Sequence, residues 1–597
     1  DLLDKRQPLT GKMIPDQSEA YRSGNHLFSA EKRQIRLSAA RNEFTGFQVF
    51  FEGEVRHLIP QLKLSYAPNL PINQRAGSGR VSISADSKTT KSDPSSTAIE
   101  IEFSRMHNVD TPDGPLPDPV IPLAPDGFSL PDARHDPSGS RYGSVLCEAY
   151  VPHDAPAGLY TGKLSLKSDD AETEIDVQLW VWNFTLPDRL GFLPEMNCYG
   201  LPENEGDYYR LAHLHRTVLN RVPYSQNGSI ASGCAPKWDG RTLDWTDWDR
   251  RFGPLLDGSA FDDLPRGGVP LECFYLPLHE NWPSPMDGNY NGDYWADRAF
   301  PPSYREALVS VSRQMAEHFA DRGYNRTIFQ CYQNNKNNFK SDGWSRGSSP
   351  WLLDEPANFQ DYWALYYFAD AFHEGVREAY GRNFRPGEEN GELPMMHYRT
   401  DISRPEWQRE LFDGLQQYAV VGGSAFRKYH DMVIDRKEEF GGKVIPYGSN
   451  NAVEESNMQA VGWCLDNYLL GADGVLPWQT VGRHESWDKG DRLAIFYPGS
   501  RWNRREPFPS IRLKAYRRGQ QDVEYCLLLG QTFGRPETEY PAWVTRDMVR
   551  RAIALEGRHG TSDPSAAEDA GVTSFDRLRP QDVWNLRIRI ARTIDAR

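Results

Sequence analysis

The pattern of apolar residues changes at Leu186-Pro187, and this change limits the folds that the chain can adopt. Before it, short alternating runs are broken by Pro, Gly and Asp, which predicts an antiparallel β-sandwich over residues 1–187. After it, apolar strand candidates alternate with segments of helical period, the pattern of parallel βα units. We therefore predict a TIM-like (β/α)8 barrel over 188–509, followed by a mostly helical extension, 510–597, packed on the barrel.

Nine apolar segments after the change are candidates for the barrel strands. Eight or nine such units favour a (β/α)8 barrel over an open sheet. The candidates are Gly191 to Cys198, Arg221 to Tyr224, Val269 to Leu278, Thr327 to Cys331, Trp351 to Asp354, Pro394 to Tyr398, Tyr418 to Gly422, Val444 to Tyr447 and Gly474 to Trp478.

Composition excludes several classes of function. The 597 residues exceed what one hydrophobic core usually supports, so we expect two to four domains. A net charge of -15 argues against nucleic acid and anionic membranes as partners. No run of about 18 apolar residues occurs, so we predict no membrane span. GxGxxG, P-loop and Cys/His metal spacings are missing, which predicts neither a cofactor nor a metal.

The chain begins with Asp1 rather than Met, from which we expect a removed leader and a secreted or periplasmic protein, with the cytoplasm as the alternative. Seven scattered cysteines indicate no disulfide framework. The 17 Trp and 28 Tyr are more informative, because flat aromatic faces suit sugar rings. The sequence gives no indication of the oligomeric state.

Asp354-Glu355-Pro356 is the strongest candidate for a catalytic site. Other acid pairs in the chain lie in polar stretches, typical of solvated surface, whereas an apolar run leads into this one. Pro356 disfavours a helical conformation at Glu355, which predicts a turn between a strand and the following helix. Barrel enzymes carry their catalytic groups at the carboxyl ends of strands, so we predict that both acids reach one site there.

Several motifs resemble glycoside hydrolase family 123 and its wider group of uncharacterised relatives. The matches extend over nearly the whole chain, and they are more specific for the architecture than for the substrate. They are residues 41–43, 46–48, 151–162, 180–187, 497–499, 509–514 and 517–525.

The resemblance implies a β-N-acetylgalactosaminidase that acts on a glycan and has an adjacent Asp-Glu pair after a barrel strand. Asp354-Glu355 occupies the matching place. The implied reaction is substrate-assisted hydrolysis with retention, in which the 2-acetamido oxygen of the substrate attacks the anomeric carbon. Glu355 is then the general acid and base, and Asp354 orients the acetamido N–H and stabilises the oxazolinium-like intermediate.

Aromatic side chains are candidates for binding the sugar. A tyrosine hydroxyl commonly holds the acetamido carbonyl in this mechanism, and we predict Tyr398 for that role, with Tyr447 as the second choice. Trp478 follows the last strand and is expected to wall the acetamido group. Trp282 and Trp502 are expected to stack on sugar faces, although each indole could equally belong to a core.

Polar candidates leave an alternative open. Glu280 follows a predicted strand, and at about 5–5.5 Å from Glu355 it would permit a retaining mechanism with a protein nucleophile. Otherwise Glu280 binds a sugar hydroxyl or forms a loop salt bridge. Asn334 begins a segment that departs from the family pattern, and we count it among the substrate-binding residues. Arg399 and Asp401 are interpreted as a loop ion pair. A third possibility is a carbohydrate-binding barrel without catalysis.

Overall fold

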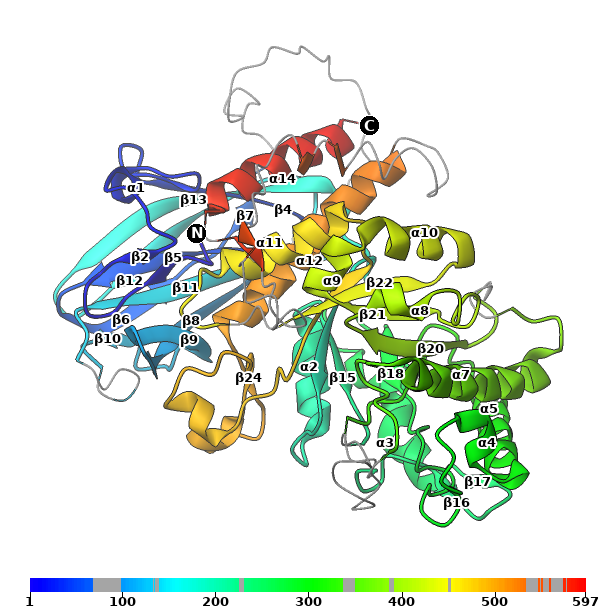
Figure 1. Ribbon diagram of the computed structural model, residues 1–597. Helices are drawn as coiled ribbons and strands as arrows, with labels where there is room; N and C mark the ends of the chain where they lie inside the picture. Colours follow the sequence, from blue (N-terminus) through cyan, green and yellow to red (C-terminus); the bar gives the residue numbers. More distant parts are fainter. Residues whose placement is uncertain are drawn as a thin grey trace.

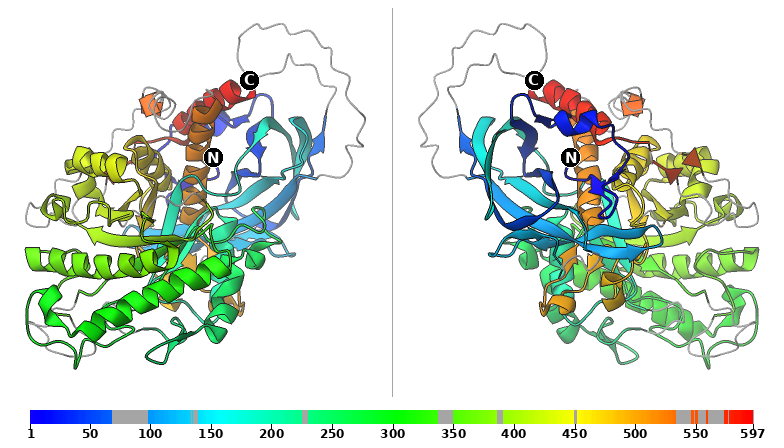
Figure 2. Two further views of the ribbon diagram at one scale, coloured as in Figure 1. Left: turned by 90° about the vertical axis from the view of Figure 1, so that its right-hand side faces the viewer. Right: turned by 90° about the vertical axis from the view of Figure 1, so that its left-hand side faces the viewer.

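The chain forms a β-sandwich, a barrel and C-terminal helices, in this order (Figure 1). Figure 2 shows the sandwich and the barrel side by side, with helix α12 (Ile511–Thr532) between them. The predicted fold class is therefore confirmed. The computed structural model describes residues 1–67, 98–132, 134, 139–224, 230–336, 349–385, 391–448, 452–532, 546–547, 549–550, 558–559, 573–575 and 577–596.

Two sheets form the sandwich. One has the order β10-β6-β12-β13-β4-β3, with β7 also paired to β12, and the other has the order β5-β11-β8-β9. Neighbours are antiparallel except β13 and β4, which run parallel. Alternation drives the packing: in β12, Tyr160, Leu164 and Leu166 are buried, whereas Lys163 and Lys167 face solvent. The strands are β3 (Phe28–Ser29), β4 (Gln34–Arg41), β5 (Glu43–Glu52), β6 (Val55–Gln61), β7 (Ser65–Tyr66), β8 (Glu100–Thr111), β9 (Gly114–Pro122), β10 (Phe128–Leu130), β11 (Tyr142–Val151), β12 (Gly158–Lys167) and β13 (Glu172–Thr185).

Eight parallel strands form the barrel, in the order β15-β14-β23-β22-β21-β20-β19-β18. The two outer strands of this order contact each other, and the Tyr275 N–H in β18 donates to the Asn220 side chain on β15 at 3.2 Å, which closes the ring. The strands are β14 (Leu193–Cys198), β15 (Val218–Arg221), β18 (Cys273–Tyr275), β19 (Ile328–Tyr332), β20 (Met395–Ile402), β21 (Tyr418–Gly422), β22 (Lys443–Gly448) and β23 (Gly474–Pro477).

The prediction of a strand over Trp351 to Asp354 is wrong. β19 and β20 pair directly along their lengths, so the sheet has no place for a strand between them. The apolar residues of this segment are buried for a different reason: the Trp351 indole packs against Tyr290 and Phe300 and donates to the Tyr294 carbonyl at 2.9 Å. The segment is a buried loop that leads from β19 into α7.

Helices follow the barrel strands and cover the ring (Figure 1). α5 and α7 lie side by side, and Gly375 permits the contact, because a Cβ there would meet the Val309 carbonyl oxygen at 2.3 Å. α7 matters for the site because the loop with the acid pair enters its first turn. The main helices are α2 (Glu205–Leu214), α3 (Thr246–Leu256), α5 (Pro302–Asp321), α7 (Phe359–Tyr380), α8 (Pro405–Gln408), α9 (Gly423–Lys428), α10 (His430–Phe440) and α11 (Met458–Leu469).

α12 takes the position of the eighth barrel helix. It follows β23 and packs against α11 and β14. The predicted boundary at residue 509 therefore cuts the barrel before its last helix. The final helix, α14 (Pro580–Asp595), packs on α12 and on sandwich strand β13, so the C-terminal region contacts both domains rather than the barrel alone. Among the described helices, none combines the length and the apolar character needed to cross a membrane.

Buried ion pairs join the sandwich to the C-terminal helices. The Arg587 guanidinium on α14 pairs with Glu43 on β5 and with Asp522 on α12, the latter at 2.5 Å. Lys514 and Arg517 on α12 both pair with Glu148 on β11. Since a buried carboxylate that loses its partner is strongly destabilising, these pairs fix how the two domains meet.

Arg587→Met is expected to lower the free energy of unfolding by about 3–5 kcal/mol, because Glu43 and Asp522 would keep buried charges without their shared cation. Urea denaturation followed by tryptophan fluorescence measures the change. Arg589→Met, an exposed position on the same helix, is the matched control and should change stability by less than about 0.5 kcal/mol. Equal stability of both variants would contradict the role assigned to Arg587.

Candidate active site

The loop between β19 and α7 holds Asp354 and Glu355 by backbone contacts on both sides. The N–H groups of Leu353 and Asp354 donate to the Asn335 carbonyl at 3.0 and 3.3 Å, and the Glu355 N–H donates to the Asp401 carbonyl at 3.1 Å. Asn335 follows β19 and Asp401 belongs to β20, so two neighbouring strand ends fix the pair. The residues lie where barrel enzymes place their chemistry.

Glu355 adopts an unusual backbone conformation, with φ of 58°. Non-glycine residues seldom occupy this left-handed region, and such outliers occur at functional sites. The chain therefore turns at Glu355, but within a loop and not at the end of a strand. On its other side, Asn358 caps α7 with Asp361 in a capping box, and Asp361 also accepts the Leu352 N–H at 3.1 Å. The first turn of α7 thus fixes the loop that carries the acid pair.

The side chains of the pair are held by one lysine and one tyrosine. Lys336 Nζ lies 2.7 Å from Glu355 Oε2 and 3.4 Å from Asp354 Oδ2. The Tyr447 hydroxyl donates to Glu355 Oε1. Partial burial opposes the charge of Lys336, but the two carboxylates prevail and raise the pKa of its ammonium. Lys336 therefore carries a full positive charge beside the pair.

Aromatic side chains surround the pair at other strand ends. Tyr447 lies on β22, and Trp478 directly follows β23. Tyr199, directly after β14, meets Trp478 edge to face with ring centroids 5.1 Å apart. Burial raises the pKa of the Tyr199 phenol, and the negative charges of Asp354 and Asp401 raise it further. Trp478 and Tyr447, both predicted site residues, are thus brought to the same end of the barrel as the pair.

Glu280 lies in a tight turn after β18, in which the backbones of His279 and Trp282 bond to each other. Its side chain is 1% exposed. Burial raises the pKa of the Glu280 carboxyl to about 7, although a hydrogen bond from the Asn335 side chain acts in the opposite direction. His279 is also buried, which lowers the pKa of its ring to about 3. His279 is therefore neutral near pH 7, whereas the Glu280 carboxyl is mostly protonated only at pH values well below 7.

Two predicted residues are not brought to the pair. Tyr398 is fully buried, and its hydroxyl lies 2.5 Å from the Gln333 side-chain oxygen and 2.9 Å from the Leu365 carbonyl of α7, behind the strand. Trp502 packs in a cluster against the sandwich, edge to face with His107. Trp282 is half-buried against the main core at the Glu280 turn. Asn334 follows β19 and is fully buried.

Sequence reasoning missed the part that four residues play. Arg399 and Asp401, interpreted as a loop ion pair, instead lie inside the barrel as a bidentate pair, with N–O distances of 2.7 and 2.8 Å. Their i, i+2 spacing within a strand is the signal, because it places both on one face. Lys336 and Tyr199 carry no comparable signal, since lone charged or aromatic residues after strands are common.

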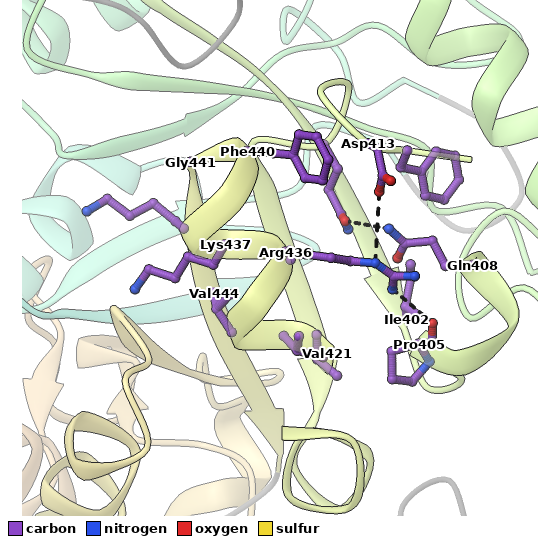
Figure 3. Close-up of a pocket in the computed structure, with 15 residues that line it drawn as sticks. Ile402, Pro405, Gln408, Asp413, Val421, Arg436, Lys437, Phe440, Gly441 and Val444 are labelled. Carbon is purple, nitrogen blue, oxygen red and sulfur yellow. Dashed lines mark hydrogen bonds and ion pairs between the residues drawn. The ribbon is translucent and has the colours of Figure 1, made fainter. Parts of the chain in front are cut away.

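A hollow on the outer face of the barrel is a weaker candidate. Figure 3 shows Arg436 of α10 pointing between α8 and Asp413, with its guanidinium 3.2 Å from the Pro405 carbonyl and 3.9 Å from Asp413. The hollow has a volume of about 40 Å³. Among the described residues, no group of three or more His, Cys, Asp or Glu side chains could hold a metal ion.

Glu280→Gln tests the environment of the buried carboxyl. Because the folded-state pKa is raised, the wild type loses stability as the pH rises from about 4.5 to about 7, whereas an amide does not titrate. The variant should therefore gain about 3 kcal/mol on the wild type between pH 4 and pH 8. Denaturation at several pH values measures the difference, with exposed Glu306→Gln as the control; a difference that does not vary with pH would contradict the raised pKa.

Comparison with known proteins shows a likeness in the fold. No family model and no curated protein matches the sequence. The structure of a family 123 glycoside hydrolase from Clostridium perfringens, analysed for glycolipid glycan hydrolysis, is similar over 94% of both chains, with a TM-score of 0.56 and 12% identity.

Other solved structures align more loosely. A β-glucuronidase from Parabacteroides merdae covers 66% of this chain and 45% of its own, at 11% identity and a TM-score of 0.26. A putative α-galactosidase/melibiase from Bacteroides fragilis has the same identity and score over 71% and 73%. Scores this low carry no argument. The resemblance to family 123 glycoside hydrolases is thus confirmed at the level of the fold.

Proposed function

We propose that the protein is a retaining glycoside hydrolase that removes β-linked N-acetylhexosamine, with N-acetylgalactosamine as the first candidate, by substrate-assisted catalysis. The observation that carries the proposal is the adjacent pair Asp354-Glu355, held at the carboxyl end of the barrel by two strand ends and the start of α7. The shared fold with a family 123 hydrolase supports it. That relative's substrates make a glycolipid glycan the natural substrate to test first.

In the first step, the acetamido carbonyl oxygen attacks the anomeric carbon as the glycosidic C–O bond breaks. Glu355 gives its proton to the departing oxygen, and Asp354 accepts the acetamido N–H and stabilises the positive oxazolinium. In the second step, water attacks the anomeric carbon, the Glu355 carboxylate takes the water proton, and the acetamido group is restored. Two displacements at one carbon give net retention.

Lys336 and Tyr447 prepare the pair for this sequence. Lys336 balances the charge of the resting pair. Its side chain is 39% exposed, so the flexible ammonium can move toward solvent when a sugar reaches Glu355. Glu355 takes up a proton from solvent as the ammonium leaves it, and this is the proton that it donates in the first step. The Tyr447 hydroxyl, which donates to Glu355, is then available to the acetamido carbonyl.

The alternative with Glu280 as nucleophile is less well supported. A nucleophilic carboxylate has to be ionised, but burial raises the pKa of Glu280 to about 7. Lys336, the cation at the site, forms ion pairs with Asp354 and Glu355 rather than with Glu280. A neutral carboxyl is better suited to bind a hydroxyl group than to attack carbon.

Glu355→Gln and Asp354→Asn should each lower kcat/KM for nitrophenyl β-N-acetylgalactosaminide by about 10²–10⁴-fold, since one loses the proton donor and the other the carboxylate that stabilises the intermediate. Release of nitrophenol measures turnover, with β-GlcNAc, β-galactoside and β-glucoside substrates beside it. Matched controls are Asp370→Asn and Glu374→Gln, two acids on α7 that pair with Arg305 and should retain full activity.

The outcomes of this assay separate the candidate functions. Turnover limited to 2-acetamido sugars and lost in both variants supports the substrate-assisted reaction. Hydrolysis of 2-hydroxy sugars contradicts it and favours a protein nucleophile. Binding of glycans without any turnover, on nitrophenyl sugars and on glycolipids, favours a carbohydrate-binding barrel.

Tyr447→Phe should lower kcat for the 2-acetamido substrate by about 10–100-fold, because a hydrogen bond to a charged group is worth about 1.5–3 kcal/mol. Tyr398→Phe is the control: its hydroxyl contacts Gln333 and α7, so its loss should affect stability and leave kcat unchanged. A larger loss of kcat in Tyr398→Phe would restore Tyr398 as the acetamido ligand.

A further inference from the structure

A cavity of about 470 Å³, which we call the α2 cavity, lies between the start of α2 and the segment that follows β24 (Phe496–Tyr497). Its volume falls in the range of sites that bind small ligands. One wall consists of residues 202–204 and Tyr208, and the other of residues 498–500, 504 and 505. The two walls meet where the Asn204 side chain donates to the Arg505 carbonyl, and Figure 1 shows the segment after β24 next to α2.

Both walls of the α2 cavity begin at strand ends beside the acid pair. One wall follows β14: Pro202 comes three residues after Tyr199, so their Cα atoms are at most about 11 Å apart. The other wall follows β23: the N–H of residue 496 donates at 3.0 Å to the carbonyl of Thr480, two residues after Trp478. Since Tyr199 and Trp478 contact each other next to the pair, a short glycan whose terminal sugar lies at the pair can reach the cavity.

The wall after β24 is a compact turn that closes on itself. The Arg504 N–H donates to the Gly499 carbonyl at 3.1 Å, and a Cβ at Gly499 would meet the Glu506 carbonyl oxygen at 2.1 Å. The Trp487 indole donates to the Pro498 carbonyl at 2.9 Å and fixes the base of the turn. The turn therefore presents its two arginines to the cavity from a fixed backbone.

The α2 cavity carries more positive than negative charge, although the protein has a net charge of -15. Arg504 and Arg505 line it, and Glu203 is the one acid among the described residues that do so. Arg505 pairs with Asp207 of α2 at 3.0 Å, which ties the two walls together. Arg504 approaches Glu506 only to 3.8 Å, and both side chains are exposed, so this pair is weak. The Arg504 guanidinium can therefore exchange its partner for a ligand.

The chemistry of the cavity matches an anionic group on a sugar. A planar guanidinium offers paired N–H donors that fit the oxygens of carboxylate and sulfate groups. Glu203 is exposed, so its side chain can turn into solvent and away from such a group. The Ser500 hydroxyl, exposed on the opposite wall, adds a neutral donor.

We infer that the α2 cavity binds an anionic group, a carboxylate or a sulfate ester, on the part of the glycan that the reaction releases. The inference rests on the proposed function, which puts the terminal sugar at Asp354 and Glu355. It names the class of substrate: an acidic glycan in which a charged group follows the terminal residue. Electrostatic complementarity of this kind selects among glycans that share the same terminal sugar.

Binding rather than turnover tests the inference, in Glu355→Gln protein so that little substrate is consumed. Titration calorimetry compares β-N-acetylgalactosaminyl-lactose with two charged forms of the same trisaccharide, one with sialic acid and one with a sulfate ester on its galactose. At least one charged form should bind about 10-fold more tightly than the neutral one, because arginine makes charge-assisted hydrogen bonds to the added group. Tighter binding of only one form identifies whether the cavity takes the carboxylate or the sulfate.

Substitutions of the two arginines locate the effect. Adding Arg504→Gln should reduce the affinity for the charged glycan to that for the neutral trisaccharide, and Arg505→Gln should reduce it in part, because Asp207 already shares that guanidinium. The matched control is Arg501→Gln, an exposed arginine of the same turn that pairs with Asp488 and should preserve the preference. Added NaCl should weaken the preference, since it screens exposed charges.

The remaining outcomes contradict the inference. Equal affinity for the neutral and both charged glycans overturns it, and so does a preference that survives the double substitution of Arg504 and Arg505. Failure of all three glycans to bind overturns it too. The proposed function is decided separately, because nitrophenyl β-N-acetylgalactosaminide has no sugar on its leaving group: turnover of this substrate by the wild type supports the proposed function even where the charge preference is absent.

Discussion

The barrel depends on one guanidinium buried at its centre. Arg399 donates to both Asp401 oxygens, to Glu195 at 3.2 Å and to Gln330 at 2.9 Å, and it also contacts the Tyr275 hydroxyl. These partners come from β14, β18, β19 and β20. Because a buried charge that loses a partner is costly, the five groups hold the four strands in one arrangement. The strand ends above them therefore stand at fixed distances.

Because the strand ends are fixed in this way, a short loop between two of them can hold two acids in place. Asp401, clamped by Arg399 through its side chain, offers its carbonyl to the Glu355 N–H. Asn335 offers its carbonyl to Asp354 and its amide to Glu280. Asn335 and Asp401 do not belong to the acid pair, but their backbone carbonyls fix the positions of Asp354 and Glu355. Sites supported by such second contacts keep their geometry better than sites on free loops.

Periodicity was sufficient to predict the sandwich and the barrel. It failed where a buried segment is not periodic: Trp351-Leu352-Leu353 has the composition of a strand, but a buried loop has the same composition. It also misplaced Tyr398. Since Arg399 points into the barrel, alternation turns its neighbour Tyr398 toward the helices, and the structure bears this out.

Long-range contacts limit prediction in a different way. Lys336 pairs with Asp354 and Glu355, which follow it by 18 and 19 positions in the chain. No local sequence pattern predicts this contact. Glu280, after β18, bonds to the side chain of Asn335, after β19, and these two residues are far apart in the chain. Trp502 was predicted to stack on a sugar face, but it packs against the sandwich, where it meets His107.

The left-handed backbone at Glu355 sets stability and chemistry against each other. A side chain held in this region costs on the order of 1–3 kcal/mol, whereas glycine adopts it freely. Selection for folding alone would favour glycine at position 355. A descendant of this chain that no longer needed the carboxylate would therefore gain folding stability by replacing Glu355 with glycine. At this position, a change from hydrolase to binding protein would stabilise the fold.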